Sequence, residues 1–378
     1  MLFKTDLYEV FVPSYLLIGM ASLAAFLITF IAIPSLVKIS HQKGLMAHPN
    51  GRTSHMIPTP NLGGVAIFTG VIIASVIFTG ITTAHELKYM IAGMLILFFV
   101  GLKDDLQEIP AYQKLVGQSV ASLIIILPGN FYLHSLHGLF GIHELGFFPG
   151  VIITWFLFQV LINSLNLIDG IDGLASGIGI HASLFFGIVF LISGLMAYAV
   201  LSFVLAASLL AFFYFNVFSK KNKIFMGDTG SMLIGLLISI LTIKFLNIEN
   251  STLFFSQNHV APAVALSVLL VPLFDAARVS VVRISQGKSP FAADRTHIHH
   301  YVLRLSDSHI TATLMILSAN AFFIALPWLF RNLNGEVLIL MMLALSVILF
   351  NIPVYINRQN EKIGLKYDFG ELSYRKVG

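Results

Sequence analysis

The sequence predicts an all-α protein, a polytopic integral membrane bundle of about eleven transmembrane helices, on three observations. The 378 residues are 57% hydrophobic and only 11% charged, whereas a soluble domain carries about 25% charged residues. Apolar runs of the length that crosses a bilayer, about 20 residues, recur along the whole chain. Lysine and arginine residues gather in alternate gaps between these runs.

The first expected helix, 14–37, follows Asp6, Glu9 and a lone Lys4, and it is longer than the apolar core of a signal peptide. We therefore expect it to remain as an uncleaved first helix. The third and fourth expected helices, 88–102 and 114–128, are short, so the count is only approximate. The other eight runs are 62–80, 149–167, 174–194, 197–218, 231–247, 261–284, 310–330 and 336–356.

No long polar stretch separates these runs, so we expect a single transmembrane domain over residues 1–357. A basic tail, 358–378, follows it and is expected to lie at the membrane surface. The chain has no cysteine, which excludes disulfides and thiolate metal sites.

The distribution of positive charge predicts the orientation of the bundle. With eleven helices, the gaps between them alternate sides, and five of these gaps with the C-terminal tail share one side. That side holds 18 of the 22 Lys and Arg residues, and the other side holds only Lys4, Lys88, Lys244 and Arg331. By the positive-inside rule the first side is cytoplasmic, with the N-terminus outside and the C-terminus cytoplasmic.

The polar motifs of the chain occupy the same five gaps. The outer gaps offer only polar loops such as "HSLHGLFGIHEL". We therefore expect the functional machinery at the cytoplasmic membrane surface. The five motifs are "GRTSHMIPTPNLGG" (51–64), "GLKDDLQEIPAYQK" (101–114), "NSLNLIDGIDGLASG" (163–177), "KKNKIFMGDTGS" (220–231) and "GKSPFAADRTHIHH" (287–300).

Asp104 and Asp105 are adjacent carboxylates at the end of an apolar run. A charged side chain at the bilayer centre costs about 2.5–3.5 kcal/mol on insertion scales, so we expect the pair at the boundary or in a watered cleft. One interpretation is a solvated loop start that caps the next helix. The other is an anionic site for a divalent ion or for Lys and Arg partners.

Four oxygen-donor side chains recur at every third position in the third gap: Asn163, Asn166, Asp169 and Asp172. In a helix, consecutive members of such a series are neighbours on one face. Carboxylate and amide oxygens suit Mg²⁺ or a polar ligand. An Asp/Asn/Gly turn at a helix end is the alternative.

Asp228 lies between two glycines in "FMGDTGS", directly before an expected helix. Thr229 or Ser231 could cap that helix, and an Asp is favoured near a helix N-terminus. Glycines ahead of a helix also expose backbone N–H groups to phosphate, so capping and phosphate binding both remain open.

The fifth gap brings Arg295, His297, His299 and His300 together in "DRTHIHH". Arg and His donate hydrogen bonds suited to pyrophosphate or sugar hydroxyls, which we favour. A transition-metal site and a solvated loop are the alternatives.

In this order, these motifs resemble the polyprenyl-phosphate N-acetylhexosamine-1-phosphate transferase family. That family includes the WecA- and TagO-type enzymes and the more distant MraY translocase. The resemblance runs over about residues 43–304, and its last element looks WecA-like. The matching segments are "PTPNLGG", "GLKDD", "NSLNLIDGIDGLASG", "FMGDTGS" and "DRTHIHH".

The resemblance implies an enzyme of a bacterial cytoplasmic membrane with its active site on the cytoplasmic face. It would transfer a sugar 1-phosphate, expected to be that of N-acetylglucosamine, from a UDP-N-acetylhexosamine to undecaprenyl phosphate. UMP is the second product, and the reaction starts lipid-linked cell-surface glycan synthesis. Mg²⁺ or Mn²⁺ is the implied cofactor. Membrane lipid and a homodimer are the other partners considered, and no nucleic acid is expected.

The resemblance also implies roles for individual residues. Asn166 and Asp228 would ligate the metal, and Asp172 would contact the uracil with Asp169 in the same pocket. Asp104 and Asp105 would lie where the lipid phosphate enters. Pyrophosphate and sugar would be held by Arg295, His297, His299 and His300, and the first family loop would contribute Arg52 and His55.

Elementary electrostatics supports the same chemistry. Two anionic phosphates must approach each other, so Mg²⁺, Lys114 and Arg295 are needed to neutralise them. A phosphate monoester has a second pKa of about 6, so the acceptor needs no strong base. We expect Asp104 and Asp105 to orient groups or tune charge, with catalysis as a base the weaker alternative.

Three rival functions were weighed. A CDP-alcohol phosphotransferase is rejected because "DGIDGLASG" lacks the Arg and later acids of that family's motif. A secondary transporter would bind substrate near the midplane between internal repeats, whereas no repeat is visible here. An MraY-type donor, the muramoyl pentapeptide, is the runner-up within the family.

Overall fold

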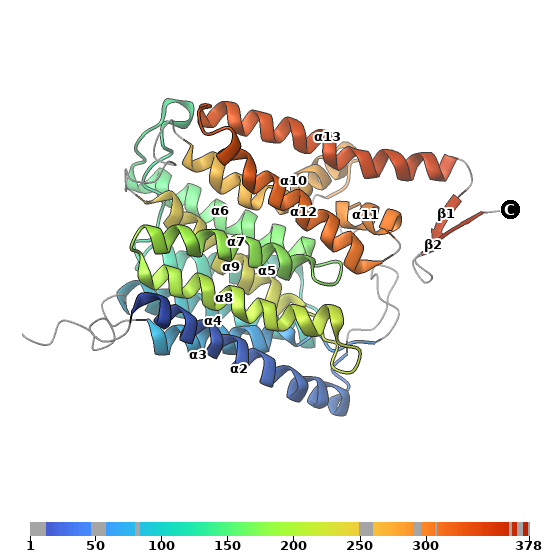
Figure 1. Cartoon of the computed structure of the whole chain (residues 1–378), viewed down its shortest axis with the longest axis horizontal. Coiled ribbons are helices and arrows are strands. Elements are labelled where there is room, and N and C mark those ends of the chain that lie inside the picture. The colour runs from blue at the N-terminus through green and yellow to red at the C-terminus, as the bar shows by residue number, and fades with distance from the viewer. Residues whose placement is uncertain are drawn as a thin grey trace, which may run out of the picture.

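The computed structural model describes residues 13–46, 58–79, 84–248, 260–289, 296–306, 308–362, 365–368 and 373–376. In this part of the chain almost all regular structure is helical, and the long helices run side by side (Figure 1). Each of the eleven apolar runs predicted from the sequence corresponds to a helix among the described residues. Eight helices of the described residues are long and apolar enough to cross a membrane. The protein is therefore a polytopic membrane bundle.

The helices that match the predicted runs are α2 (Ser14–Lys43), α3 (Gly63–Phe78), α4 (Ala84–Leu106), α5 (Ala111–Ile126), α6 (Phe147–Ile168), α7 (Leu174–Ile192), α8 (Met196–Phe213), α9 (Gly227–Leu246), α10 (Ala261–Ser285), α12 (His309–Leu329) and α13 (Gly335–Lys362). Two short segments add single turns, the 3₁₀ turn η2 (Leu139–Gly141) and the π turn η3 (Tyr214–Phe218), which continues α8.

Two elements were not predicted from the sequence. The nine-residue helix α11 (Ile298–Ser306) lies in the fifth gap, where "HIHH" forms its beginning. The tail forms an antiparallel hairpin of β1 (Leu365–Asp368) and β2 (Ser373–Lys376). The all-α prediction therefore holds for the bundle but did not include this small hairpin. Both elements lie at the same end of the molecule (Figure 1).

α9 is the central helix of the bundle. Of its most apolar 18-residue window, 94% is buried within the protein, against 22% for α2 and 28% for α13. It packs against α3, α4, α6 and α7. Gly235 permits the contact with α6, because a Cβ at this position would lie 2.6 Å from the Cα of Ile162.

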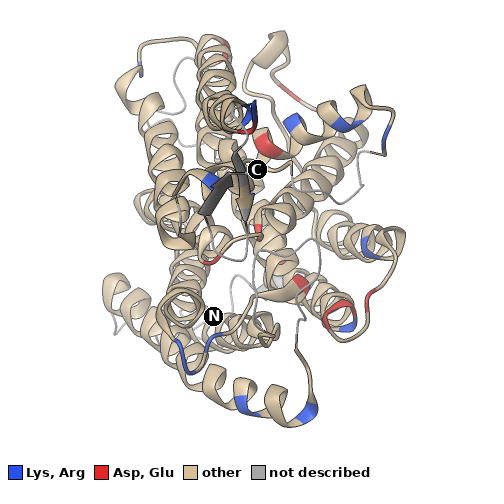
Figure 2. Cartoon of the chain, turned by 90° about the vertical axis from the view of Figure 1, so that its right-hand side faces the viewer, with Lys and Arg blue, Asp and Glu red and all other residues tan. Residues whose placement is uncertain are grey.

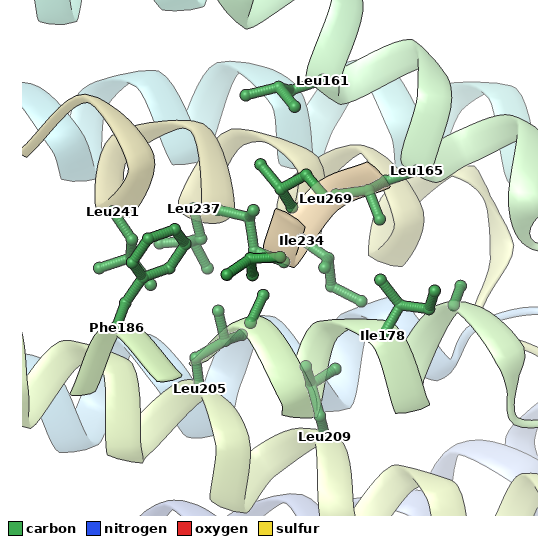
Figure 3. Close-up of a cluster of buried hydrophobic side chains, with 14 of the residues drawn as sticks. Leu161, Leu165, Ile178, Phe186, Leu205, Leu209, Ile234, Leu237, Leu241 and Leu269 are labelled. Carbon is green, nitrogen blue, oxygen red and sulfur yellow. The ribbon is translucent and has the colours of Figure 1, made fainter. Parts of the chain in front are cut away.

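The core around α9 is a continuous cluster of aliphatic and aromatic side chains, part of which is drawn in Figure 3. Within a bilayer the alternative to these contacts is lipid rather than water, so close van der Waals packing of the side chains holds the helices together. A rigid core on every side of α9 therefore fixes where its N-terminus lies. The residues labelled in Figure 3 are Leu161, Leu165, Ile178, Phe186, Leu205, Leu209, Ile234, Leu237, Leu241 and Leu269.

Candidate active site

The first turn of α9 is capped by a carboxylate from another helix. Asp105, at the end of α4, accepts hydrogen bonds from the backbone N–H groups of Asp228 (2.8 Å) and Thr229 (3.0 Å). It also accepts one from the Thr229 hydroxyl, at 2.6 Å. The first N–H groups of a helix have no partner within the helix, and a carboxylate there also interacts favourably with the helix dipole.

The sequence suggested that Thr229 or Ser231 could cap α9, and neither does. No side chain at the N-cap position makes the capping bond. Ser231 Oγ instead donates back to the carbonyl of Gly227, at 3.1 Å. Asp105 takes the role because Gly227 has φ +72 and a Cβ there would lie 2.6 Å from both Asp105 carboxylate oxygens. Only glycine lets the carboxylate approach this closely.

The first and fourth gaps lie side by side through backbone contacts. Gly63 N–H donates to the carbonyl of Phe225 (2.9 Å), and Phe225 N–H donates to that of Pro60 (2.7 Å). Asn61 Nδ2 donates to the backbone carbonyl of Asp105, at 3.1 Å. The first gap therefore supports the Asp105 cap. Arg52 and His55 lie outside the described residues.

Lys114 joins two acidic residues of the site. Its Nζ lies 2.7 Å from Asp104 Oδ2 and 3.2 Å from Asp228 Oδ2. Asp104 also accepts the backbone N–H of Ile109, at 2.9 Å. A lysine at the start of α5 thus compensates carboxylates from α4 and α9.

Asn166 connects the third gap to the same carboxylate. Its Nδ2 donates to Asp228 Oδ1 and, at 2.8 Å, to Ser231 Oγ. Asn163, one turn earlier, turns away and donates to Gln118 Oε1, at 2.8 Å. The series of oxygen donors read from the sequence therefore divides, and only its later members belong to the site.

The loop between α6 and α7 carries Asp169 and Asp172. Asp172 Oδ2 lies 2.6 Å from Lys223 Nζ, and His309 Nδ1 lies 3.8 Å from the same oxygen. The loop is held at its end by Asn216 Oδ1, which accepts the backbone N–H of Gly173 at 2.6 Å.

The acids of the site carry more negative charge than their partners compensate. Burial, then the charge of Asp228, Asp172 and Asp105, raises the pKa of Asp169 to about 8. Asp104 and Asp105 lie beyond the apolar run 88–102. Burial raises the pKa of Asp105 to about 7, and burial with Asp228 raises that of Asp104 to about 6. An additional cation would relieve this repulsion.

The histidines of α11 reach the third gap. His299 is buried, and a Cβ added to Gly170 would lie 2.1 Å from its Nε2. Burial, then the neighbouring histidines and Arg278, lowers the pKa of His299 well below its usual value. His297 Nδ1 lies 2.9 Å from Asp275 Oδ2, and the rings of His299 and His300 are 4.3 Å apart. Arg295 lies outside the described residues.

Four residues with contacts in this region were not found from the sequence: Lys223, Asn216, Asp275 and His309. Asp275 had a signal, since it is a carboxylate within the apolar run 261–284, and ionisable residues in such runs are functional by default. Asn216 had one as well, since it is an amide within the apolar run 197–218, whereas Lys223 had none because it lies among the other polar residues of "KKNK".

The donor set was tested for its fit to a divalent cation. Among the described residues no group of three or more His, Asp or Glu side chains has the arrangement of a metal site. Mg²⁺, however, is commonly held by one or two carboxylates, waters and substrate phosphates. Asp228 and Asn166 are oxygen-bearing side chains in contact, and Asp169 adds an undercompensated carboxyl nearby. These residues fit Mg²⁺ or Mn²⁺ rather than a softer metal.

All five polar gaps therefore meet at one end of the bundle. Asp105 joins the first, second and fourth, Asp228 joins the second, third and fourth, and His299 against Gly170 adds the fifth. This end faces the viewer in Figure 2, where acidic and basic residues lie around it.

Comparison with known proteins gives a consistent result. The profile of Glycosyl transferase family 4 matches residues 87–246, which run from α4 to the end of α9. An undecaprenyl-phosphate alpha-N-acetylglucosaminyl 1-phosphate transferase of Escherichia coli O157:H7 is 30% identical over 303 residues, 79% of this chain and 80% of that protein.

Two further relatives are similar over comparable lengths. The Yersinia pestis protein of the same name is 31% identical over 287 residues, 75% of this chain and 76% of its own. A Bacillus subtilis (strain 168) protein named "Probable undecaprenyl-phosphate N-acetylglucosaminyl 1-phosphate transferase" is 31% identical over 300 residues, 79% and 81% of the two chains.

Proposed function

The chain belongs to glycosyl transferase family 4, and on that premise we propose that it transfers N-acetylglucosamine 1-phosphate from UDP-N-acetylglucosamine to undecaprenyl phosphate. A phosphate oxygen of the lipid attacks the phosphorus next to the sugar, and the bond from that phosphorus to the UMP oxygen breaks. The products are undecaprenyl-pyrophosphoryl-N-acetylglucosamine and UMP. The observation that carries this function is the meeting of five distant gaps around Asp228 and Asp105.

The main task of the site is to bring two phosphates together. Phosphoryl transfer needs positioning and compensation of charge more than covalent chemistry. Lys114, between Asp104 and Asp228, supplies a fixed positive charge for this purpose. The lipid phosphate is largely dianionic near neutral pH, so a general base is not required.

Asp104 and Asp105 have different roles in this proposal. Asp105 receives three hydrogen bonds from the start of α9, so it orients Asp228 and cannot also take a proton without losing them. Asp104 holds Lys114, and through it sets the charge offered to the phosphates. Both residues act as orienting groups, in agreement with the interpretation favoured from the sequence.

Asp228 and Asn166 are the proposed ligands of Mg²⁺ or Mn²⁺. The cation, when bound, neutralises part of the charge on the two phosphates. Asn166 is fixed by Ser231 and Asp228 is fixed by its place in the capped turn of α9. Asp169 adds a negative charge beside the cation once its carboxyl releases its proton.

The donor would bind between the α6–α7 loop and α11. Asp169 and Asp172 lie on that loop, and His299 and His300 lie on α11. Asp172 is paired with Lys223, so a uracil contact of Asp172 would include this lysine or displace it. His297, whose ring is held by Asp275, belongs to the support of this pocket.

We propose that all eleven helices cross a bacterial cytoplasmic membrane, with the N-terminus outside and the site on the cytoplasmic face. The support is the placement of 18 of 22 Lys and Arg residues in the five gaps that meet at the site and in the tail. No observation favours the muramoyl-pentapeptide donor or a transporter, since the relatives cited above are N-acetylglucosaminyl 1-phosphate transferases by name.

The test is a donor assay with the purified full-length protein. Three donors, UDP-N-acetylglucosamine, its epimer UDP-N-acetylgalactosamine and the muramoyl-pentapeptide donor, are each supplied with undecaprenyl phosphate and Mg²⁺. We expect UMP release and a lipid product of N-acetylglucosamine mass, and no product with the Asp228→Asn variant. The proposal would be contradicted if only another donor gave a lipid product, or if no donor led to UMP release.

A further inference from the structure

Asp275 is a buried carboxylate that contacts the start of α11, the helix that carries His299. It lies in α10 and is 2% exposed. Its Oδ2 accepts a hydrogen bond from His297 Nδ1, at 2.9 Å. Its Oδ1 accepts one from the backbone N–H of Ile298 (2.9 Å) and one from Arg278 Nη2 (3.1 Å). A buried carboxylate that accepts from His297 and Ile298 ties the start of α11 tightly to α10.

One of these bonds caps α11. Ile298 is the first residue of that helix, and its N–H group has no partner within the helix. Arg278 adds a second tie, because its Nη2 also donates to the backbone carbonyl of Thr296. Contacts with α10 therefore fix the position and orientation of the start of α11.

Both ring nitrogens of His297 have a partner within the protein. Its Nε2 lies 3.4 Å from Nη2 of Arg283, which is itself buried. A guanidinium group only donates, so Nε2 accepts and the partners assign the ring proton to Nδ1. With Nδ1 donating to Asp275, His297 has no ring nitrogen left for a substrate.

His299 differs from His297 in this respect. It is 1% exposed, and within the described residues its Nδ1 has no hydrogen-bond partner. Its ring stacks on that of His297 with centroids 5.6 Å apart and planes 12° apart. Its Nε2 approaches Gly170 of the α6–α7 loop. The position of His299 therefore depends on the first turn of α11, which the hydrogen bonds of Asp275 to His297 and to the backbone of Ile298 hold in place.

We propose that Asp275 is a positioning residue for the sugar-nucleotide donor: it holds His297 and the first turn of α11 so that His299 lies against the α6–α7 loop. The proposal rests on the transferase function above. Asp275 touches neither substrate, and its effect passes through His297 and α11 to the donor pocket alone.

This role makes a specific kinetic prediction for Asp275→Asn. The amide keeps the size of the side chain but turns an NH₂ group toward one of three buried donors. We expect KM for UDP-N-acetylglucosamine to rise about ten-fold or more, the scale of one lost buried hydrogen bond to a charged group. KM for undecaprenyl phosphate should stay within about two-fold of the wild-type value, a change much smaller than the rise expected for the donor.

A purely structural role would give another result. If the variant only lowered the number of folded molecules, apparent kcat would fall and both KM values would stay at wild type. Glu86→Gln is the matched control, since Glu86 also pairs with a cation, Lys244 at 3.4 Å, and lies on another helix, α4. We expect both KM values of this control to be unchanged.

Two variants of His297 decide the question even if Asp275→Asn does not fold. In His297→Asn the amide nitrogen can take the place of Nδ1 and still donate to Asp275. In His297→Ala the side chain at position 297 can no longer donate to Asp275. We expect His297→Asn to keep the wild-type KM for the donor and His297→Ala to raise it. Equal impairment of the two would overturn the proposal, because the ring itself would then be needed.

The failure of this inference is distinguishable from failure of the proposed function. If the wild-type protein releases no UMP from UDP-N-acetylglucosamine, the function is wrong. If the wild type is active and Asp275→Asn keeps both wild-type KM values, the function stands and the positioning role of Asp275 is wrong.

Discussion

The carboxylate of Asp105 belongs to a helix cap and to the site at the same time. Three of its donors come from Asp228 and Thr229. Replacing it by asparagine turns an NH₂ group toward a backbone N–H, which leaves a buried donor without a partner. Such a loss costs about 1–3 kcal/mol. The geometry of Asp228 would change with it.

We therefore expect Asp105→Asn to lower kcat by about 5- to 150-fold, the range that this energy corresponds to. The measurement is the initial rate of UMP release at saturating substrates. Glu108→Gln is the control, because Glu108 is an exposed acid of the same gap and should leave the rate unchanged. Near-normal turnover of Asp105→Asn would refute an orienting role and a base role alike.

The raised pKa of Asp169 predicts how cation binding depends on pH. Burial, then repulsion from the neighbouring acids, raises the pKa of Asp169 to about 8. The Asp169 carboxyl thus holds a proton near neutral pH when no cation is bound, and a cation must displace this proton. Affinity for Mn²⁺ should rise between pH 6 and pH 8.

Titration calorimetry of the purified protein with Mn²⁺, in two buffers of different ionisation enthalpy, measures this proton release. Asp169→Asn removes one titrating group, so it should release fewer protons per cation. A Mn²⁺ affinity that is constant over this pH range would contradict the expected competition.

Residue types in the site could largely be predicted from the sequence, but their partners could not. Asp104, Asn166 and Asp228 were candidates because oxygen donors at the ends of apolar runs are rare and costly. That Asp105 caps α9 depends on two residues 123 positions apart, and no local pattern encodes such a contact. Asp275 was detectable in principle, yet it lies one helix away from the motifs and was overlooked.

Among the elements, three helices that carry or support the site begin at a side chain from elsewhere. α9 begins at Asp105 of α4, α11 at Asp275 of α10, and the turn before α7 at Asn216 of η3. A helix capped by its own residue can form early and shift later. A helix capped by a neighbour takes its final place only when the neighbour is present.

The glycine at position 170 makes room for α11. A Cβ there would lie 2.1 Å from His299 Nε2, so Gly170→Ala must displace the histidine or the loop. Overpacking of this kind costs about 1–3 kcal/mol. We expect a KM for UDP-N-acetylglucosamine about ten-fold higher or more, in line with that cost.

Gly19→Ala is the control for this change, because a Cβ at Gly19 of α2 meets nothing within 4 Å. It should leave KM unchanged and raise the thermal midpoint slightly, since alanine favours a helix. If Gly170→Ala kept the wild-type KM, the donor would not bind between α11 and the α6–α7 loop.

The helices could be predicted from the sequence where the apolar run was long. Each of the eleven apolar runs corresponds to a helix among the described residues, since hydrophobic length is the strongest pattern in such a chain. α11 was missed because nine residues in a polar gap give no run of that length. The hairpin was missed because two four-residue strands in a basic tail carry only a weak alternation.

For the whole molecule, the predicted topology is testable because the chain has no cysteine of its own. Gln107 and Glu144 are both exposed and lie in gaps predicted to be on opposite membrane faces. A membrane-impermeant maleimide should label Glu144→Cys in intact spheroplasts. It should label Gln107→Cys only after the spheroplasts are broken.

Labelling of Gln107→Cys in intact spheroplasts would place the acid pair outside, where no nucleotide sugar is available. UMP release by each variant confirms that it folds. The same experiment with Lys221→Cys, exposed in the fourth gap, should follow Gln107→Cys, because the two gaps meet at the site.

The enclosure of α9 has a consequence for how the protein responds to its surroundings. Thinner or thicker bilayers act on surfaces that touch acyl chains, which here belong to the outlying α2 and α13 and hardly at all to α9. Hydrophobic mismatch should therefore tilt the periphery and leave the start of α9 in place. Reconstituted in lipids of different chain length, the protein should keep its affinity for a divalent cation even where the thermal midpoint falls.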